Sequence, residues 1–190
     1  MTRKSLSAIG ISGSPSAKSR SRGLLEHALA RLEARGIVTG VIDLNALPAD
    51  GLLGRSASAE VTRALAQVAV ADIVVASTPV YRATYTGLLK VFFDLFEHHA
   101  LVGKIGIALA SGGAPGHQLV LDHGLRPLFT SVGAVVVSTG VYAVDEEVVA
   151  GIPNERVRDR IERAVAEAVA LANAHDAPSR INALSPAAAP

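Results

Sequence analysis

Apolar residues along this chain alternate between short continuous runs and helically spaced positions. The continuous runs predict β-strands, at residues 5–11, 37–44, 72–77, 105–110 and 134–139. The stretches with apolar residues at helical spacing predict α-helices, at residues 21–34, 57–70, 84–96, 117–131 and 155–174. The run at 72–77 is almost entirely apolar, which is typical of a parallel strand covered on both faces. Strands and helices therefore follow one another as far as the last predicted helix.

This alternation predicts an α/β protein in which a doubly wound parallel sheet forms the middle of three layers. Because parallel strands are joined by right-handed crossovers, we expect a five-stranded, flavodoxin-like sheet with strand order 2-1-3-4-5. Residues 45–56 contain a proline and two glycines and predict a surface connection. We expect residues 1–175 to form one domain and residues 176–190, rich in alanine and proline, to be a disordered tail.

Composition narrows the class of protein. Of the 190 residues, 49% are hydrophobic and 18% are charged, so we expect a soluble globular protein with additional burial in an oligomer interface. The formal charge of +1 gives no reason to expect nucleic acid as a partner. The absence of cysteine excludes thiol catalysis, disulfides and iron–sulfur ligation. We see no signal peptide and no apolar run long enough to span a membrane, so we expect a cytoplasmic location.

The loop at residues 12–22 ends the first predicted strand with glycine, hydroxyls and cations. Gly10 and Gly13 are too far apart for a dinucleotide-binding turn, and Ser12 and Ala17 stand where a P-loop needs glycines. Such a turn before a helix suits a single phosphate, as in a mononucleotide, with FMN the leading candidate. The residues we expect to serve that phosphate are Ser12, Ser14, Ser19, Arg20 and Ser21. The alternative is a polar turn in which Ser19 or Ser21 only caps the helix.

Two more loops follow the third and fourth predicted strands, on the same edge of the sheet. The first of them offers a stiff turn and aromatic surface for a flat ring, in Thr78, Pro79, Val80 and Tyr81. The second lets the backbone approach a ligand closely, through Ser111, Gly112, Gly113 and His117. The alternatives are a rigid strand-to-helix connection with its tyrosines on the helix, and a flexible turn. Together the three loops favour a flavin site.

Several short motifs resemble the NAD(P)H-dependent FMN reductase family over about residues 7–149. They are Gly13-Ser14-Pro15, Ser19-Arg20-Ser21, Thr78-Pro79-Val80-Tyr81, Gly87-x-x-Lys90 and Ser111-Gly112-Gly113. The most similar subgroup is the reductase component of two-component alkanesulfonate and methanesulfonate monooxygenase systems. The resemblance implies a flavodoxin-like fold, a homotetramer or dimer, and reduction of FMN by NADH or NADPH. It also implies that reduced FMN is released to a transient, sulfonate-related flavin-dependent monooxygenase.

The chain departs from the family pattern at two places. Ser16 stands where family members often carry arginine, so phosphate binding depends more on the other residues of the first loop. The stretch Leu121–Leu125 resembles one in which an extra residue distorts the helix into a π-bulge at the tetramer interface. Within it, His123 stands where a tyrosine often occurs, which makes His123 a candidate for flavin exchange.

Hydride transfer to a flavin requires stacking and proximity, so we expect no catalytic acid or base. We also expect no metal site, because the histidines at 98–99, 117 and 123 lack the spacing of known metal motifs. No Gly-x-Ser-x-Gly elbow supports a serine hydrolase. Two alternatives stay open: a reductase of quinones, azo compounds or metal oxyanions with FMN permanently bound, and a flavodoxin-type carrier. The near-neutral charge disfavours the carrier. For a choice between NADH and NADPH, only Arg82 is a candidate contact to a 2′-phosphate.

Overall fold

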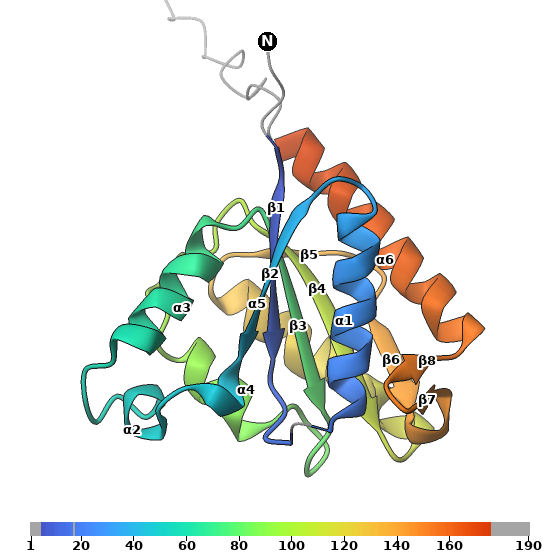
Figure 1. Ribbon diagram of the computed structural model, residues 1–190, viewed down its shortest axis with the longest axis horizontal. Helices are drawn as coiled ribbons and strands as arrows, with labels where there is room; N and C mark the ends of the chain where they lie inside the picture. The colour runs from blue at the N-terminus through green and yellow to red at the C-terminus, as the bar shows by residue number, and fades with distance from the viewer. Residues whose placement is uncertain (1–4, 17, 176–190) are drawn as a thin grey trace, which may run out of the picture.

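A parallel sheet with strand order β2-β1-β3-β4-β5 forms the centre of the molecule (Figure 1). The computed structural model describes residues 5–16 and 18–175, so the predicted tail at 176–190 lies outside the described residues. The strands of the sheet are β1 (Ser7–Ser12), β2 (Val38–Asp43), β3 (Ile73–Pro79), β4 (Ile105–Gly112), β5 (Val135–Val136) and β6 (Val141–Val144). The predicted fold class and strand order are confirmed.

The fifth position of the sheet is shared by two short strands, so the prediction of one strand over 134–139 is wrong. β5 pairs with the beginning of β4, and β6 pairs with its end. Between them, side chains from two helices bind the backbone. Arg126 donates to the carbonyls of Val137 (2.8 Å) and Ser138 (2.9 Å), and Glu167 accepts from the Thr139 N–H (2.9 Å). These bonds replace part of the ladder that a continuous strand would form.

Helices cover both faces of the sheet (Figure 1). One face carries α1 (Arg20–Glu33) and α6 (Glu155–His175); the other carries α3 (Ala59–Val70), α4 (Gly87–Phe93) and α5 (Arg126–Ser131). Successive side chains of β3 pack alternately on the two faces of the sheet. Ile73 and Val75 belong to the core under α1 and α6, whereas Val74 and Ala76 belong to the opposite core. None of the helices in the described part of the chain is long and apolar enough to cross a membrane.

The prediction of a helix over 84–96 is too long at both ends. α4 begins at Gly87 because Thr86 occupies its N-cap, where the Thr86 hydroxyl accepts a hydrogen bond from the Leu89 N–H (3.2 Å). Before the cap, the chain makes a tight turn in which Arg82 and Ala83 both have positive φ angles (51° and 68°). Tyr81 and Tyr85 therefore lie on a loop rather than on a helix.

The predicted helix over 117–131 is divided into three pieces. They are a 3₁₀-helix η2 (Pro115–Leu119), a π-helix η3 (Leu121–Leu125) and α5. Pro127 has no N–H, so the α-helical hydrogen bond to the carbonyl of His123 cannot form. The Arg126 N–H instead donates to the carbonyl of Leu121, five residues earlier. The π-helix therefore lies in the stretch for which the family resemblance implied one.

Short elements that the hydrophobic pattern did not indicate lie in the connections. Between β2 and α3 are the 3₁₀-helix η1 (Leu44–Ala46) and α2 (Ala49–Leu52). Between β6 and α6 are the 3₁₀-helix η4 (Asp145–Glu147) and an antiparallel hairpin of β7 (Val148–Val149) and β8 (Ile152–Pro153). This hairpin packs against α1 at the right of Figure 1.

Glu147 binds residues on both sides of the β7–β8 hairpin. Its carboxylate accepts hydrogen bonds from the Val144 N–H (3.0 Å) and from Arg156 Nε (2.7 Å), and its backbone carbonyl accepts from the Asn154 N–H (2.8 Å). Burial alone would raise the pKa of Glu147. The hydrogen bonds from Arg156, Val144 and Asn154 outweigh burial and lower that pKa below its usual value of 4.5.

Replacing Glu147 by glutamine is expected to lower the free energy of unfolding at neutral pH by about 1–2 kcal/mol. Because the pKa of Glu147 is lowered in the folded state, its carboxylate stabilises the fold fully above the unfolded pKa. That contribution is lost as pH falls through the lowered folded pKa. The difference between wild type and Glu147→Gln should therefore stay constant from pH 6 to 8 and shrink below about pH 4. Urea unfolding across this range measures it, with the exposed neighbour in Glu146→Gln as control. A difference that grows on acidification would contradict the assignment.

Candidate functional site

The three loops selected from the sequence meet at the carboxyl edge of the sheet. The register of the strands places the end of β1 beside β3 and the end of β3 beside β4. Backbone hydrogen bonds join the loops directly: the Gly13 N–H donates to Ser77 (2.8 Å) and the Val80 N–H to Ser111 (2.7 Å). Between them lies a cleft of about 230 Å³.

Most of the predicted residues line this cleft. Those that do are Ser14, Ser19, Arg20, Pro79, Val80, Tyr81, Ser111, Gly112 and Gly113. Three further residues line it that were not among the predicted site residues, namely Ser16, Lys18 and Asp145. Asp145 carried no signal in the sequence, because its run of acidic residues is typical of a solvated turn.

The remaining predicted residues of the first two loops lie beneath the cleft and support it. Ser12, Ser21 and Thr78 are buried and do not line the cleft. The Ser21 carbonyl accepts a hydrogen bond from the Ser77 hydroxyl (2.6 Å), which ties the start of α1 to β3. The Thr78 hydroxyl accepts from the Thr86 N–H (3.1 Å), which ties the second loop to β3.

The start of α1 keeps hydrogen-bonding capacity for an anion. Ser19 occupies the N-cap, but its side chain accepts no hydrogen bond from the first turn of the helix. Its hydroxyl instead lies 2.7 Å from the Ser21 hydroxyl. Within the described residues, no side chain caps the N–H groups of the first turn, so they can serve another acceptor next to the cations Lys18 and Arg20. The alternative, that Ser19 or Ser21 only caps the helix, is not what the structure shows, because the Ser19 side chain makes no cap bond and Ser21 lies within α1.

The two glycines after β4 differ in the space around them. A Cβ added to Gly112 would lie 2.8 Å from the Tyr142 hydroxyl, so no side chain fits there. A Cβ added to Gly113 would have Asp145 Oδ2, at 3.8 Å, as its nearest neighbour, so a side chain there would project toward the cleft. Burial raises the pKa of Tyr142, so its hydroxyl stays a neutral donor, bonded to the Ala114 carbonyl (2.6 Å).

His117 lies behind the third loop rather than on the cleft surface. Its Nδ1 atom is buried and has no hydrogen-bond partner among the described residues. The atom lies 3.5 Å from the position of a Cβ added to Gly112. A buried polar atom ordinarily bonds to a protein group or to an ordered water molecule, because leaving it unpaired costs free energy.

The π-helix η3 packs under the second loop. A Cβ added to Gly124 would lie 3.0 Å from the ring of Tyr85. His123 is exposed on this helix and does not line the cleft. No group of three histidine, aspartate or glutamate side chains within residues 5–16 and 18–175 is placed to hold a metal ion.

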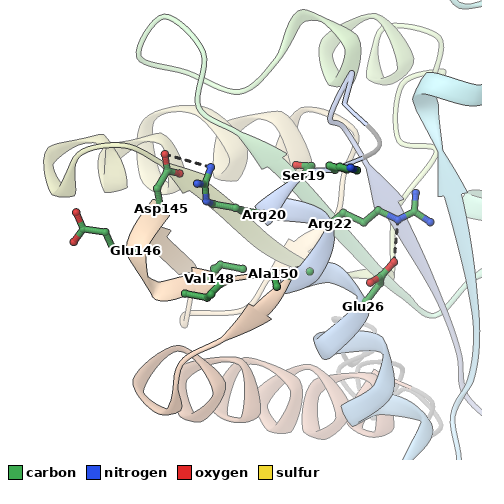
Figure 2. Close-up of a pocket in the computed structure, with 12 residues that line it drawn as sticks. Ser19, Arg20, Arg22, Glu26, Asp145, Glu146, Val148 and Ala150 are labelled. Carbon is green, nitrogen blue, oxygen red and sulfur yellow. Dashed lines mark hydrogen bonds and ion pairs between the residues drawn. The ribbon is translucent and has the colours of Figure 1, made fainter.

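A larger groove of about 770 Å³ opens beside the cleft, between the start of α1 and the β7–β8 hairpin. The groove and the cleft share Lys18, Ser19, Arg20 and Asp145. Figure 2 shows Arg20 reaching toward Asp145, at 3.6 Å, while Arg22 turns toward Glu26, at 2.9 Å. Two cations of the first loop, Arg20 and Arg22, thus already have carboxylate partners.

Comparison with known proteins gives consistent matches. Residues 6–148 match the family model for NADPH-dependent FMN reductases. The chain is 39% identical to the NADH-dependent FMN reductase SfnE of Pseudomonas putida, over 90% of this chain and 95% of that protein. It is 38% identical to an FMN reductase (NADPH) of Pseudomonas putida KT2440, over 74% of this chain and 72% of that protein. The crystal structure of the apo form of the NADH:FMN oxidoreductase EMOB superposes with a TM-score of 0.79 at 36% identity, covering 85% of this chain and 87% of that one.

Proposed function

The chain belongs to the family of NADPH-dependent FMN reductases, and we propose that it uses NADH or NADPH to reduce FMN that enters and leaves the cleft as a diffusible substrate. As a member of this family it is an oxidoreductase. The reduced FMN would pass to a partner flavin-dependent monooxygenase. The observation that carries the proposal is the convergence of three loops on one cleft beside the uncapped start of α1.

The residues present fit FMN. Its phosphate would lie at the first turn of α1, where Ser14, Ser19 and Arg20 offer hydroxyls and a cation. The ring would lie between the second and third loops, against Pro79 to Tyr81 on one side and Ser111 to Gly113 on the other. Ser21 and Thr78 would act beneath the cleft, by holding these loops in position. Ser12 and His117 do not line the cleft.

When bound, the flavin supplies the hydride acceptor, and the chain supplies proximity and orientation. Gly112 and Gly113 keep the third loop free of side chains, so that the backbone itself faces the ligand. Tyr81 lines the cleft and is 49% exposed, and the nicotinamide would approach the ring from the solvent side. No residue of the cleft is required as a general acid or base.

The polar groups of the cleft favour temporary rather than permanent occupancy. Hydroxyls predominate over fixed charges, and Ser16 contributes a hydroxyl where an arginine would add a cation. The two cations of the cleft, Lys18 and Arg20, are exposed to solvent, and ion pairs in such positions are weak. We therefore expect FMN to be lost from the protein during purification.

We further propose that the chain assembles as a homotetramer or dimer, with the π-helix at an interface between copies. The exposed position of His123 on η3 supports this, because the side chain is available to a second copy. His123 is also next in sequence to Gly124, which packs against Tyr85 of the second loop. An interface at His123 would therefore lie close to the second loop. Light scattering on the purified protein measures the number of copies.

The function is tested by following NADH and NADPH oxidation with FMN, riboflavin, FAD and a quinone as separate acceptors. Oxidation that requires added FMN and saturates with it is the expected result. Oxidation with quinone and no added flavin would support a reductase with permanently bound FMN instead. Absence of oxidation with every acceptor, by a protein that still binds FMN, would favour an electron carrier.

A further inference from the structure

Arg20 has a competing partner at the mouth of the cleft. Its Nη1 atom lies 3.6 Å from Asp145 Oδ2, and the two side chains are 52% and 44% exposed. Both residues line the cleft and also the neighbouring groove. Figure 2 shows their side chains pointing toward one another, with the ion pair drawn as a dashed line. The guanidinium available to a phosphate is therefore already paired with a carboxylate.

Asp145 reaches the mouth of the cleft from the segment that follows β6, and hydrogen bonds hold the backbone of this segment. It begins η4, next to Val144, whose N–H donates to the Glu147 carboxylate (3.0 Å). Glu147 is bound in turn by Arg156 of α6 (2.7 Å between Nε and Oε1). The Asp145 side chain remains half exposed, so it is free to move away from Arg20 while its backbone stays fixed.

The cleft is lined by more positive than negative side chains. Among the described residues that line it, Lys18 and Arg20 are cations and Asp145 is the one carboxylate. A phosphate entering the first loop meets this carboxylate as well as the cations. Because Asp145 already offsets the charge of Arg20, the phosphate gains the full attraction of that cation only when the ion pair opens.

We propose that Asp145 is a positioning residue that competes with the FMN phosphate for Arg20 and thereby promotes release of the flavin. This inference rests on the proposed function, since it concerns the same cleft. An exposed ion pair is weak, so the phosphate can displace it, but the cost of opening the pair reduces the affinity each time FMN binds. When the flavin leaves, Asp145 takes back the guanidinium. A diffusible product benefits from such a device, because weak retention speeds its release.

Equilibrium binding of FMN and of riboflavin, which lacks the phosphate, tests the competition. Flavin fluorescence is titrated with wild type, Asp145→Asn, Arg20→Gln and the double variant. Asp145→Asn should bind FMN about two- to five-fold more tightly, the range expected for one exposed ion pair, and riboflavin unchanged. Arg20→Gln should bind FMN more weakly, and in its background Asp145→Asn should bring no gain. Riboflavin binding by each variant verifies that the cleft is folded. Glu146→Gln removes a neighbouring carboxylate that does not line the cleft and should leave both affinities unchanged.

Two results would overturn the inference while leaving the proposed function intact. Unchanged or weaker FMN binding by Asp145→Asn would show that the carboxylate does not compete. A gain that persists in the Arg20→Gln background would show direct repulsion of the phosphate rather than competition for Arg20. A wild-type protein that neither binds nor reduces FMN would instead overturn the proposed function itself.

Discussion

Gly113→Val is expected to raise the KM for FMN by about tenfold or more while leaving the fold intact. An added Cβ has only Asp145 Oδ2 within 4 Å, at 3.8 Å, so we expect the protein itself to accommodate the change. The space that it fills belongs to the cleft, where the third loop must come close to the flavin ring. Steady-state kinetics at varied FMN concentration, together with thermal unfolding, measures both effects.

Gly116→Val is the matched control for this prediction. Gly116 lies three residues further along, has no atom within 4 Å of an added Cβ, and does not line the cleft. The KM of Gly116→Val for FMN should stay close to that of wild type. An unchanged KM in Gly113→Val would show that the flavin binds elsewhere. A large loss of stability in that variant would show that the raised KM comes from damage to the fold and not from a side chain that blocks FMN.

Gly23→Ala should lower the free energy of unfolding by about 1–3 kcal/mol, even though alanine favours helices. Gly23 lies in α1 where the tip of the β7–β8 hairpin packs against the helix. An added Cβ would overlap the Gly151 carbonyl oxygen and lie 2.8 Å from Gly151 Cα. Backbone atoms cannot turn away as a side chain can. The hairpin, which forms one wall of the groove in Figure 2, must therefore move.

Gly87→Ala separates this clash from the general effect of replacing glycine in a helix. Gly87 begins α4, and an added Cβ there meets nothing within 4 Å. It should be neutral or stabilise the protein by up to about 1 kcal/mol. Thermal and urea unfolding of both variants give the comparison. Equal stability of Gly23→Ala and wild type would show that α1 and the hairpin are less closely packed than described.

The sequence was sufficient for the strand order and for the position of the three loops, because continuous apolar runs are local patterns. Continuous apolar runs marked the strands, and the topology of parallel strands then placed the loops at one edge. The division of the fifth strand position could not be anticipated in this way. It depends on Arg126 of α5 and Glu167 of α6, whose side chains bind the backbone at 137–139.

In the site, too, residues with a local sequence signal could be predicted, whereas a residue placed only by the tertiary fold could not. Ser14, Ser19 and Arg20 were recognisable from composition and from their place after a strand. Asp145 was not, because its approach to Arg20 arises only when the segment after β6 folds back onto the start of α1. A carboxylate that opposes ligand binding also has no motif of its own. It becomes visible only through the geometry of the cleft.

Counting turnovers under anaerobic conditions tests whether FMN is a diffusible substrate. Flavin-free protein is mixed with a large excess of FMN and of NADH or NADPH, and the mixture is passed through an ultrafiltration membrane that retains the protein. We predict many equivalents of reduced FMN per protein chain in the filtrate. Reduction that stops at one equivalent per chain, with the reduced flavin retained together with the protein, would show that FMN is permanently bound.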